Sequence, residues 1–317
     1  MQPPNEKKAG NSATEDELRG VNQPKIVVVG SSNTDLVVAV PSLPAPGETV
    51  LGGELQTIAG GKGANQAVAA ARLGAHVTFL ARVGDDSYGI AALAGFKAEG
   101  IDTTFVTITH GVPSGIALIA LDSQSAENLI VVAPGANAKL TAADVTAAID
   151  AFRSAQAVIV SMEIPDEAVA AAVALAHECR IPVIVNPAPA RPIAPEVLRQ
   201  ITVMTPNQSE SDLLGGSDAL LAAGVQAVVT TLGEAGAHLK TLDHFHHGPG
   251  HDVQPLDTVA AGDCFTAALA VELARGLSLP DAVHFANAAA ALKVTQRGAQ
   301  PGLPTRAAVE KFLLDRA

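Results

Sequence analysis

The stretch KIVVVGSSNTDLVVAV, residues 25–40, opens with a continuous run of β-branched residues that ends in a polar turn. Similar apolar runs recur in VTFLARVG, AVIVSMEIP, PVIVNPAPA, VMTPN and AVVTTLG. Ala-rich segments with helical patterning lie between them, at 64–73, 87–99, 141–152, 166–179 and 263–275. Strands that are apolar throughout are typical of sheets buried on both faces. The alternation therefore predicts an α/β fold, a three-layer αβα sandwich around a mostly parallel sheet.

Polar or turn-forming residues follow these apolar runs directly. They are Asn33, Asp35, Glu163, Asn186, Asn207 and Gly233. In open parallel sheets, ligands bind beyond the carboxyl ends of the strands. We therefore expect the functional residues to cluster at that edge of the sheet.

Two segments, about 36–60 and 104–133, interrupt the alternation. Both carry strand-like patterning joined by Pro and Gly turns, with no helix between. They predict a small antiparallel sheet set apart from the main sheet, which would form a β lid over the strand ends. Residues 25–317 are then one domain with its lid. Residues 1–24, with mixed charges and no apolar stretch, are expected to be a disordered tail.

Composition excludes several classes of protein. A net charge of −12 and a pI near 5.1 argue against a nucleic-acid partner. Apolar residues never run for the roughly 18 positions that a membrane helix needs. The only cysteines, Cys179 and Cys264, are far apart, which fits a reducing cytoplasm. Small molecules are the expected substrates of this cytoplasmic protein.

Histidines gather near a Gly-Pro-Gly turn in TLDHFHHGPGHDV, residues 241–253. They are His244, His246, His247 and His251. Nothing in their spacing indicates converging ligands with a fixed second layer of hydrogen bonds. We interpret the stretch as a solvated hairpin and not as a metal site.

A glycine cluster stands in AGGKGANQAVAAARLGA, residues 59–75. Its glycines would let the backbone approach a ligand closely, while Lys62 offers a point charge and Asn65 an amide. It is not a Walker A loop, because Gly63 follows Lys62 where Ser or Thr is required. The first strand also lacks the dinucleotide fingerprint, which argues against a nicotinamide-dependent dehydrogenase. Taken alone, the cluster is compatible with a tight turn.

In LDTVAAGDCFTAALAVELARG, residues 256–276, an aspartate follows three small residues at the start of a helix pattern. By itself Asp263 is best interpreted as an N-cap. The adjacent Cys264 is expected to have a structural packing role.

Nine motifs, in order, resemble the ribokinase branch of the PfkB carbohydrate kinase family. GGKGANQA and DTVAAGDCFTAA are similar to its two signatures, and GSSNTD, PGET, VGDDSYG, NPAPAR, TPNQSE, TLGEAG and VTQRGAQP fall in the family's order. The resemblance covers about Lys25 to Phe312. It implies a ribokinase-like αβα domain with a β lid, and transfer of the γ-phosphoryl of ATP to the 5-hydroxyl of D-ribose.

The resemblance also assigns site residues. Those implied for the sugar are Asn33, Asp35, Gly61, Lys62, Asn65, Glu163 and Asp263, with Asp263 as the base that accepts the hydroxyl proton. Those implied for ATP are Asn207, Thr231, Gly233, Gly236, Ala261, Gly262 and Asn287. Glu210 would act with Asn207 on Mg²⁺ through water. The N–H groups of Ala261, Gly262 and Asp263 would form an anion hole for the γ-phosphate.

For an activating K⁺ the resemblance implies Asp257, Val259, Lys293, Gln296, Gly298 and Gly302, chiefly through carbonyl oxygens. The sequence departs from the family at Gly302, where ribokinases commonly have Ser. It also departs in the segment 208–230, which is shorter than usual. Lids of this family often pair across a twofold axis, so the resemblance further implies a homodimer through the β lid.

Two alternatives to a ribokinase remain open. Another sugar or nucleoside kinase of the family could use the same scaffold, although Asn33, Asp35, Lys62 and Glu163 together favour ribose. A non-catalytic sugar- or nucleotide-binding regulator is the other alternative. The presence of Asp263 and of the N-x-x-E pattern from Asn207 to Glu210 argues against it.

Overall fold

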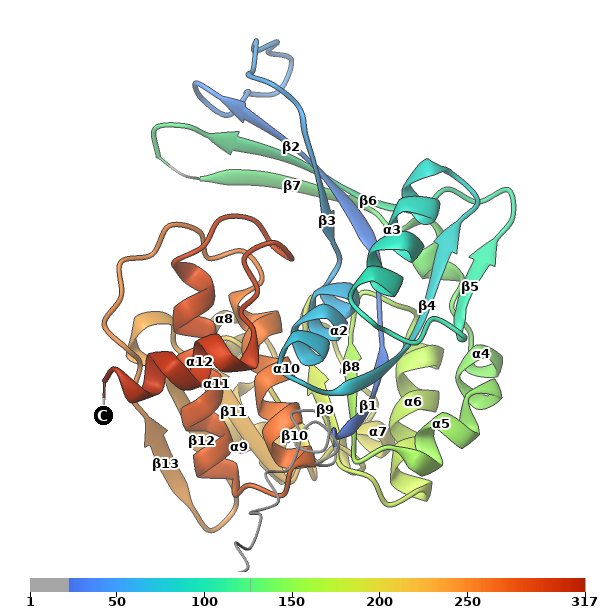
Figure 1. Ribbon diagram of the computed structural model, residues 1–317, viewed down its shortest axis with the longest axis vertical. Coiled ribbons are helices and arrows are strands. Elements are labelled where there is room, and N and C mark those ends of the chain that lie inside the picture. Colours follow the sequence, from blue (N-terminus) through green and yellow to red (C-terminus); the bar gives the residue numbers. More distant parts are fainter. Residues whose placement is uncertain (1–22, 126, 317) are drawn as a thin grey trace, which may run out of the picture.

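The computed structural model describes residues 23–125 and 127–316, and these residues form two sheets and surrounding helices (Figure 1). The tail expected at 1–24 lies almost wholly outside this range. The large sheet has the strand order β13-β12-β11-β10-β9-β8-β1-β4-β5. Its strands are β1 (Lys25–Val29), β4 (His76–Gly84), β5 (Val106–Thr109), β8 (Ala157–Ser161), β9 (Val183–Asn186), β10 (Val203–Met204), β11 (Ala227–Thr231), β12 (Ala237–Lys240) and β13 (Phe245–Gly248).

Strand pairing in the large sheet is parallel from β11 through to β5, and antiparallel only at β11-β12 and β12-β13. The helices are α2 (Lys62–Arg72), α3 (Ser87–Ala98), α4 (Ala142–Ala147), α5 (Ile149–Ser154), α6 (Asp166–Glu178), α7 (Pro195–Leu198), α8 (Gln208–Leu213), α9 (Gly216–Ala222), α10 (Ala261–Ala274), α11 (Leu279–Val294) and α12 (Arg306–Leu314). The mostly parallel sheet predicted from the apolar runs is confirmed.

Alternate residues of each central strand enter two separate cores, which explains the continuous apolar runs. In β1, Ile26 and Val28 face a core shared with α2, α10 and α11, while Val27 and Val29 face another shared with α5 and α6. Because side chains alternate across a strand, both faces of the sheet must be covered. The result is the expected three-layer αβα sandwich.

The small sheet has the order β3-β2-β6-β7, with β2 (Asn33–Val40), β3 (Gln56–Gly60), β6 (Gly115–Asp122) and β7 (Asn128–Ala133). Figure 1 shows it extending away from the body of the molecule. The prediction that it is antiparallel was wrong for its central pair, since β2 and β6 are parallel. Both strands leave the large sheet from the same edge and run outward, so they point the same way.

A second correction concerns the segment 104–133, which was expected to belong wholly to the small sheet. Its first strand, β5, instead pairs with β4 at the edge of the large sheet. Val106 of this strand is buried in the main core, and this burial favours the pairing. The helix expected at 141–152 is likewise broken at Ala148 into α4 and α5.

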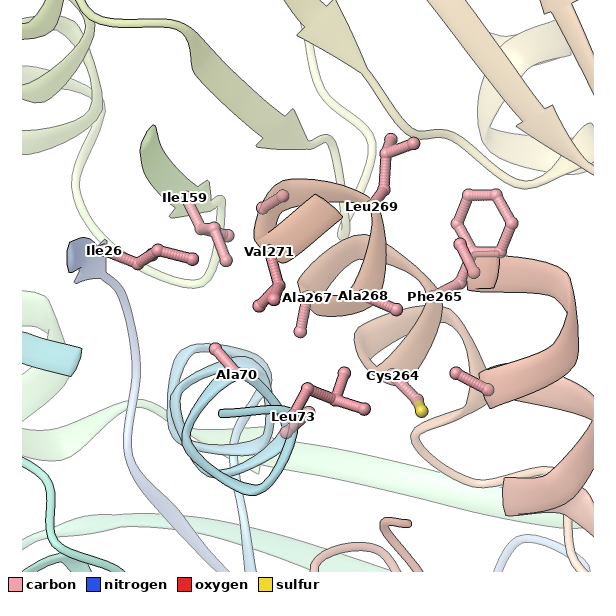
Figure 2. Close-up of a cluster of buried hydrophobic side chains, with 14 of the residues drawn as sticks. Ile26, Ala70, Leu73, Ile159, Cys264, Phe265, Ala267, Ala268, Leu269 and Val271 are labelled. Atoms are coloured by element: carbon pink, nitrogen blue, oxygen red, sulfur yellow. The ribbon is translucent and has the colours of Figure 1, made fainter. Parts of the chain in front are cut away.

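Helix α10 is the central helix of one layer. Figure 2 shows Ala267, Val271 and neighbouring α10 side chains beside Ala70 of α2 and Leu73 directly after it, with Ile159 of the sheet close by. Small residues at this contact allow the two helices to approach closely. The N-termini of α2 and α10 are thereby brought to the same edge of the sheet. None of the helices in the described part of the chain has the length and apolar character that crossing a bilayer requires.

The far end of α10 is fixed by a buried carboxylate. Glu272 is only 2% exposed, and its Oε1 accepts a hydrogen bond from Arg306 Nη1 of α12 at 2.5 Å. Arg306 also pairs through Nε with Glu310, whose side chain is 52% exposed. One arginine thus bridges a buried and an exposed carboxylate.

These two carboxylates provide a matched test of what anchors α10. Replacing Glu272 by Ala leaves the arginine without its buried partner, so we expect the free energy of unfolding to fall by about 3 kcal/mol. Glu310→Ala removes a solvent-screened pair and should cost less than about 1 kcal/mol. Urea unfolding of both variants measures the difference. Equal losses would show that burial of Glu272 does not anchor the helix.

Candidate active site

The candidate site lies where the carboxyl ends of β1, β8 and β9 meet the N-termini of α2 and α10. Glu163 follows β8 by two residues, Asn186 ends β9, and Asn33 begins β2 shortly after β1. The sequence predicted functional residues at this edge, because the carboxyl ends of parallel strands lie together there. The structure brings the predicted sugar residues Asn33, Lys62 and Glu163 into hydrogen-bonding contact, as follows.

Glu163 is the hub of the sugar side. Its Oε2 accepts hydrogen bonds from Ser31 Oγ at 2.6 Å, from the Lys62 backbone N–H at 3.1 Å and from Asn33 Nδ2 at 3.4 Å. The carboxylate therefore joins the loop after β1 to the first residue of α2. Ser31 was missed by the sequence analysis, although it lies within the quoted GSSNTD motif.

Asn137 orients Asn33 from a distant part of the chain. Its Nδ2 donates to Asn33 Oδ1 at 2.7 Å, and its Oδ1 accepts from the Ser32 N–H at 2.9 Å. Asn137 is 1% exposed and lies in the 3₁₀ turn Gly135–Lys139. The sequence analysis missed this residue because the turn follows β7 of the small sheet and carries no strand-end signal. Its Pro-Gly-Ala-Asn composition was the only available hint.

Two glycines are required by the close approach of α2 to the β1 loop. Gly61 precedes the helix with φ +89°, a backbone conformation that other residues rarely adopt. A Cβ on Gly63 would lie 2.5 Å from the Ser31 backbone nitrogen and 2.6 Å from Gly30 Cα. The glycines therefore bring backbone to backbone, and this contact places Lys62 and Asn65 at the site.

Asp263 is held by side chains of α2. Helix α10 begins at Ala261 after Ala260, whose φ is +62°, so Asp263 is the third residue of the helix. The interpretation of Asp263 as the N-cap was therefore wrong. Its carboxylate accepts from Asn65 Nδ2 at 2.9 Å and from Gln66 Nε2 at 3.0 Å. Gln66, which was not predicted as a site residue, also donates to Asn186 Oδ1 at 3.2 Å.

The amide oxygens of α2 are available for further contacts. Asn65 Oδ1 and Gln66 Oε1 are buried and have no hydrogen-bond partner among the described residues. A buried acceptor without a donor is costly, and such atoms in native proteins usually mark a place where another molecule donates. The two oxygens lie beside the Asp263 carboxylate, so they point to a hydroxyl-bearing ligand.

Carboxylates at this edge shift one another's pKa. Burial, together with the charges of Glu163 and Asp263 and against the charge of Lys62, raises the pKa of Asp35 to about 6. Burial likewise raises the pKa of Asp263, against the charge of Lys62 and the hydrogen bond from Asn65. Clusters of charged side chains with perturbed pKa values are typical of catalytic and binding sites.

Lys62 is the cation of this cluster. Burial lowers its pKa, but the carboxylates of Asp263, Glu163, Glu210 and Asp35 outweigh this effect, so the pKa is raised overall. Its ammonium group therefore stays charged in the working pH range. The charge of Glu210 thus reaches the Lys62 ammonium group.

The first turn of α10 presents free backbone donors. The N–H groups of Gly262 and Asp263 have no acceptor among the described residues, as is usual at a helix start. The Ala261 N–H donates instead to the Thr258 carbonyl at 3.2 Å. Two of the three expected anion-hole donors are thus available here, and the third is engaged.

A pocket of about 740 Å³ opens beside this helix start. It contains all the predicted ATP residues except Asn207. These are Thr231, Gly233, Gly236, Ala261, Gly262 and Asn287. Apolar side chains that the sequence analysis did not identify form much of the remaining wall, among them Val253, Phe265 and Val294. A flat aromatic base would suit such a wall.

Asn287 shapes the pocket through the backbone. Its Nδ2 donates to the carbonyls of Gly248 at 2.9 Å and Pro249 at 3.1 Å, which fixes the loop after β13.

His244, His246 and His247 lie on or next to strand β13 of the β12-β13 hairpin, and all three are exposed. His251 separates from them and lines the pocket.

Asn207 and Glu210 form the capping box of α8. Asn207 Oδ1 accepts from the Glu210 N–H at 2.8 Å, and Glu210 Oε2 accepts from the Asn207 N–H at 2.9 Å. No group of three or more His, Cys, Asp and Glu side chains suited to a metal occurs in the described ranges. One carboxylate and one amide nevertheless fit Mg²⁺, because this ion commonly keeps several waters.

The residues expected around K⁺ do not fit that ion. Lys293 is fully buried, and its Nζ donates to the carbonyls of Asp257 at 3.0 Å and Gln296 at 3.3 Å. One expected carbonyl ligand, that of Gln296, and the backbone carbonyl of Asp257 are therefore already bound to an ammonium group. At Gly302 a Cβ would lie 2.8 Å from the Gly298 carbonyl oxygen, so the serine usual in the family would not fit here without a shift.

The carboxylate of Asp257 is engaged by backbone N–H groups. Asp257 accepts from the Val259 N–H at 2.9 Å through Oδ1 and from the Gly298 N–H at 2.7 Å through Oδ2. Cys264, which follows Asp263 in the first turn of α10, is fully buried in the core. Burial raises the pKa of its thiol to about 12, which leaves it as an uncharged packing residue.

Comparisons with known proteins agree with this geometry. Residues 23–306 match the pfkB family of carbohydrate kinases. The chain is 43% identical to ribokinase of Bacillus subtilis, over 91% of this chain and 99% of that protein. It is 38% identical to ribokinase of Haemophilus influenzae, over 91% and 98% of the two chains.

Solved structures show the same fold. Ribokinase of Thermotoga maritima superposes with a TM-score of 0.83 at 34% identity, over 91% of this chain and 99% of that one. Ribokinase of Arabidopsis thaliana, solved with ribose and ATP, has a TM-score of 0.82 at 33% identity, over 92% and 99%. The chain therefore belongs to the pfkB family of carbohydrate kinases.

Proposed function

We propose that this protein is an ATP-dependent ribokinase that phosphorylates D-ribose at O5. The observation that carries the proposal is the position of Asp263, which lies between the polar carboxylate and amide recess and the pocket at the start of α10. The similarity to ribokinases from several organisms supports ribose as the sugar. The ribokinase of Arabidopsis thaliana, solved with ribose and ATP, supports ATP as the donor.

Ribose would lie against Asn33, Asp35, Lys62 and Glu163. An ionised carboxylate can accept two hydrogen bonds from neighbouring hydroxyls, which suits Asp35 to a vicinal diol. Gly61 lets the ring approach the backbone, and Asn65 Oδ1 is free to accept a further hydroxyl. A site built from such groups discriminates against sugars that leave them unpaired.

Asp263 would accept the proton of the 5-hydroxyl as that oxygen attacks the γ-phosphorus. The N–H groups of Gly262 and Asp263 would stabilise charge on the γ-phosphate, helped by the helix dipole. Phosphoryl transfer depends mainly on positioning and charge stabilisation, so a weakly basic carboxylate is sufficient. The Asn65 and Gln66 hydrogen bonds fix the carboxylate in place for this step.

The triphosphate would extend from α10 into the pocket lined by Thr231, Gly233 and Gly236. Mg²⁺, when bound with ATP, neutralises charge on the phosphates. Asn207 and Glu210 would hold it through water. We expect the enzyme to act in the cytoplasm, where ATP is available.

The small sheet would serve as a lid over the sugar and as the contact of a homodimer. Leu118, Leu129, Ile130, Val131 and Val132 on β6 and β7 are each between 46% and 53% exposed. Contiguous exposed apolar residues on a sheet are a liability unless another surface covers them. A second copy of the chain is the proposed cover.

Activity across a sugar panel and an Asp263 variant test the proposal together. ATP turnover should be highest with ribose, and lower with deoxyribose, fructose and adenosine.

Asp263→Asn should lower kcat by about 10²-fold or more, the usual contribution of a general base, while ribose affinity changes little. Its melting temperature should not fall, because the buried carboxylate is costly to ionise. The exposed Asp150→Asn is the control.

Absence of turnover with every sugar, together with measurable ribose binding, would favour the non-catalytic regulator. Retention of kcat in Asp263→Asn would show that another group takes the proton.

Ribose binding should depend on pH through Asp35. Its pKa is about 6, so the carboxylate becomes protonated as the pH falls and loses its acceptor capacity. Calorimetric affinity for ribose should therefore fall by about fourfold between pH 7.5 and pH 5.5. Asp35→Asn should bind weakly and show no such dependence. An equal pH dependence in the variant would assign the titration to another group.

The dimer is tested on the exposed face of β7. Ile130→Glu places a charge in the proposed contact, so light scattering after gel filtration should show a monomer where the wild type is a dimer. The control is Leu314→Glu, at a 77% exposed side chain on α12 away from the small sheet, and it should leave the dimer intact. A monomeric wild type would contradict the proposal.

A further inference from the structure

Lys293 is a buried cation beside the start of α10. It lies in the last turn of α11 and its side chain is fully enclosed. The ammonium donates to the carbonyl of Asp257 at 3.0 Å and to that of Gln296 at 3.3 Å. A buried lysine is rare unless its charge is compensated, so this position requires an explanation.

One of its partners, the Gln296 carbonyl, is among the carbonyls that the family resemblance assigns to an activating K⁺. The other is the backbone carbonyl of Asp257, a residue of the same expected set. The family commonly has Ser at the position of Gly302. A Cβ placed on Gly302 would lie 2.8 Å from the Gly298 carbonyl oxygen. One expected side-chain ligand is thus missing, and one expected carbonyl is bound by the ammonium.

We propose that the Lys293 ammonium replaces the activating monovalent cation, so that this enzyme does not depend on K⁺. The inference rests on the proposed kinase function. The Lys293 ammonium is part of the chain, so its positive charge is present whatever salt surrounds the protein.

The surroundings suit a permanent positive charge. The last turn of a helix favours a cation, because the C-terminal carbonyls carry the negative end of the dipole. The Asp257 carboxylate opposes the lowering of the Lys293 pKa that burial causes. An ammonium has three donors and no acceptor, so carbonyl oxygens are its natural partners.

Lys293 would act by positioning the backbone donors of α10. The N–H groups of Leu256 and Asp257 both donate to the Val294 carbonyl, at 2.7 Å and 3.1 Å, and Lys293 holds the Asp257 carbonyl. The chain runs from there through Thr258, whose carbonyl binds the Ala261 N–H, into the first turn of α10. Fixing Asp257 therefore fixes the Gly262 and Asp263 donors. Lys293 does not line the pocket, so it is a positioning residue and not a catalytic one.

The experiment compares potassium with tetramethylammonium chloride at equal ionic strength. Wild-type activity with ribose should change by less than about twofold between the two salts at about 0.1 M. Lys293→Ala removes the ammonium and opens space at the carbonyls, so it should be poorly active without K⁺. Adding K⁺ should restore it by about tenfold or more and raise its melting temperature through binding.

Lys293→Met keeps the aliphatic bulk without the charge, so K⁺ should rescue neither its activity nor its stability. The exposed Lys311→Ala should behave as the wild type. Rescue by K⁺ separates this role from simple packing, which a cation would not restore.

Strong K⁺ activation of the wild type would overturn the inference. So would full activity of both Lys293→Ala and Lys293→Met without K⁺. If the wild type phosphorylates no ribose in either salt, the proposed function fails instead, and the melting temperatures still test the cation. A potassium-dependent rise of melting temperature in the wild type would then count against the inference.

Discussion

The hydrogen bonds from Asn65 and Gln66 to the Asp263 carboxylate are the contact on which the site depends, because they tie the N-terminus of α2 to that of α10. Both helices must lie close for these side chains to meet. The small residues between them, such as Ala70 and Ala267, and the glycines at Gly61 and Gly63 permit that approach. The sandwich therefore places two helix N-termini and one carboxylate at a single edge of the sheet.

Gathering carboxylates there costs stability, and the raised pKa values of Asp35 and Asp263 show it. A carboxyl whose pKa is higher in the folded than in the unfolded chain favours folding when it is protonated. For Asp35 the cost is therefore largest above about pH 6 and is relieved as the pH falls through that value. Lys62 and the amide donors offset part of this cost. With a pKa of about 6, Asp35 is mostly ionised near neutral pH, where a sugar can use it as an acceptor.

The sequence was sufficient to predict the layers and the edge at which the site lies, because apolar runs and strand ends follow from the alternation of side chains. It did not reveal Ser31, Gln66 or Asn137, whose roles depend on contacts between distant segments. It placed β5 in the wrong sheet, since a short apolar strand pairs wherever its buried face fits. The direction of the Lys293 side chain was equally hidden: the motif placed its backbone correctly near Asp257, but a long side chain can point inward or outward.

The two sides of the site are built differently. The sugar side consists of charged and amide side chains, whereas the described lining of the nucleotide pocket is mostly backbone, small residues and apolar groups, with acidic Glu234 and Asp252 and no Lys or Arg. Apart from the Mg²⁺ that would be bound with ATP, positive charge for a triphosphate must then come from the helix dipole of α10 and from cations set behind the lining. Lys62 lies on the sugar side and Lys293 lies beneath the helix start. A charge fixed by the fold does not need to be recruited from solution, so the protein can hold its α10 donors ready before either substrate arrives.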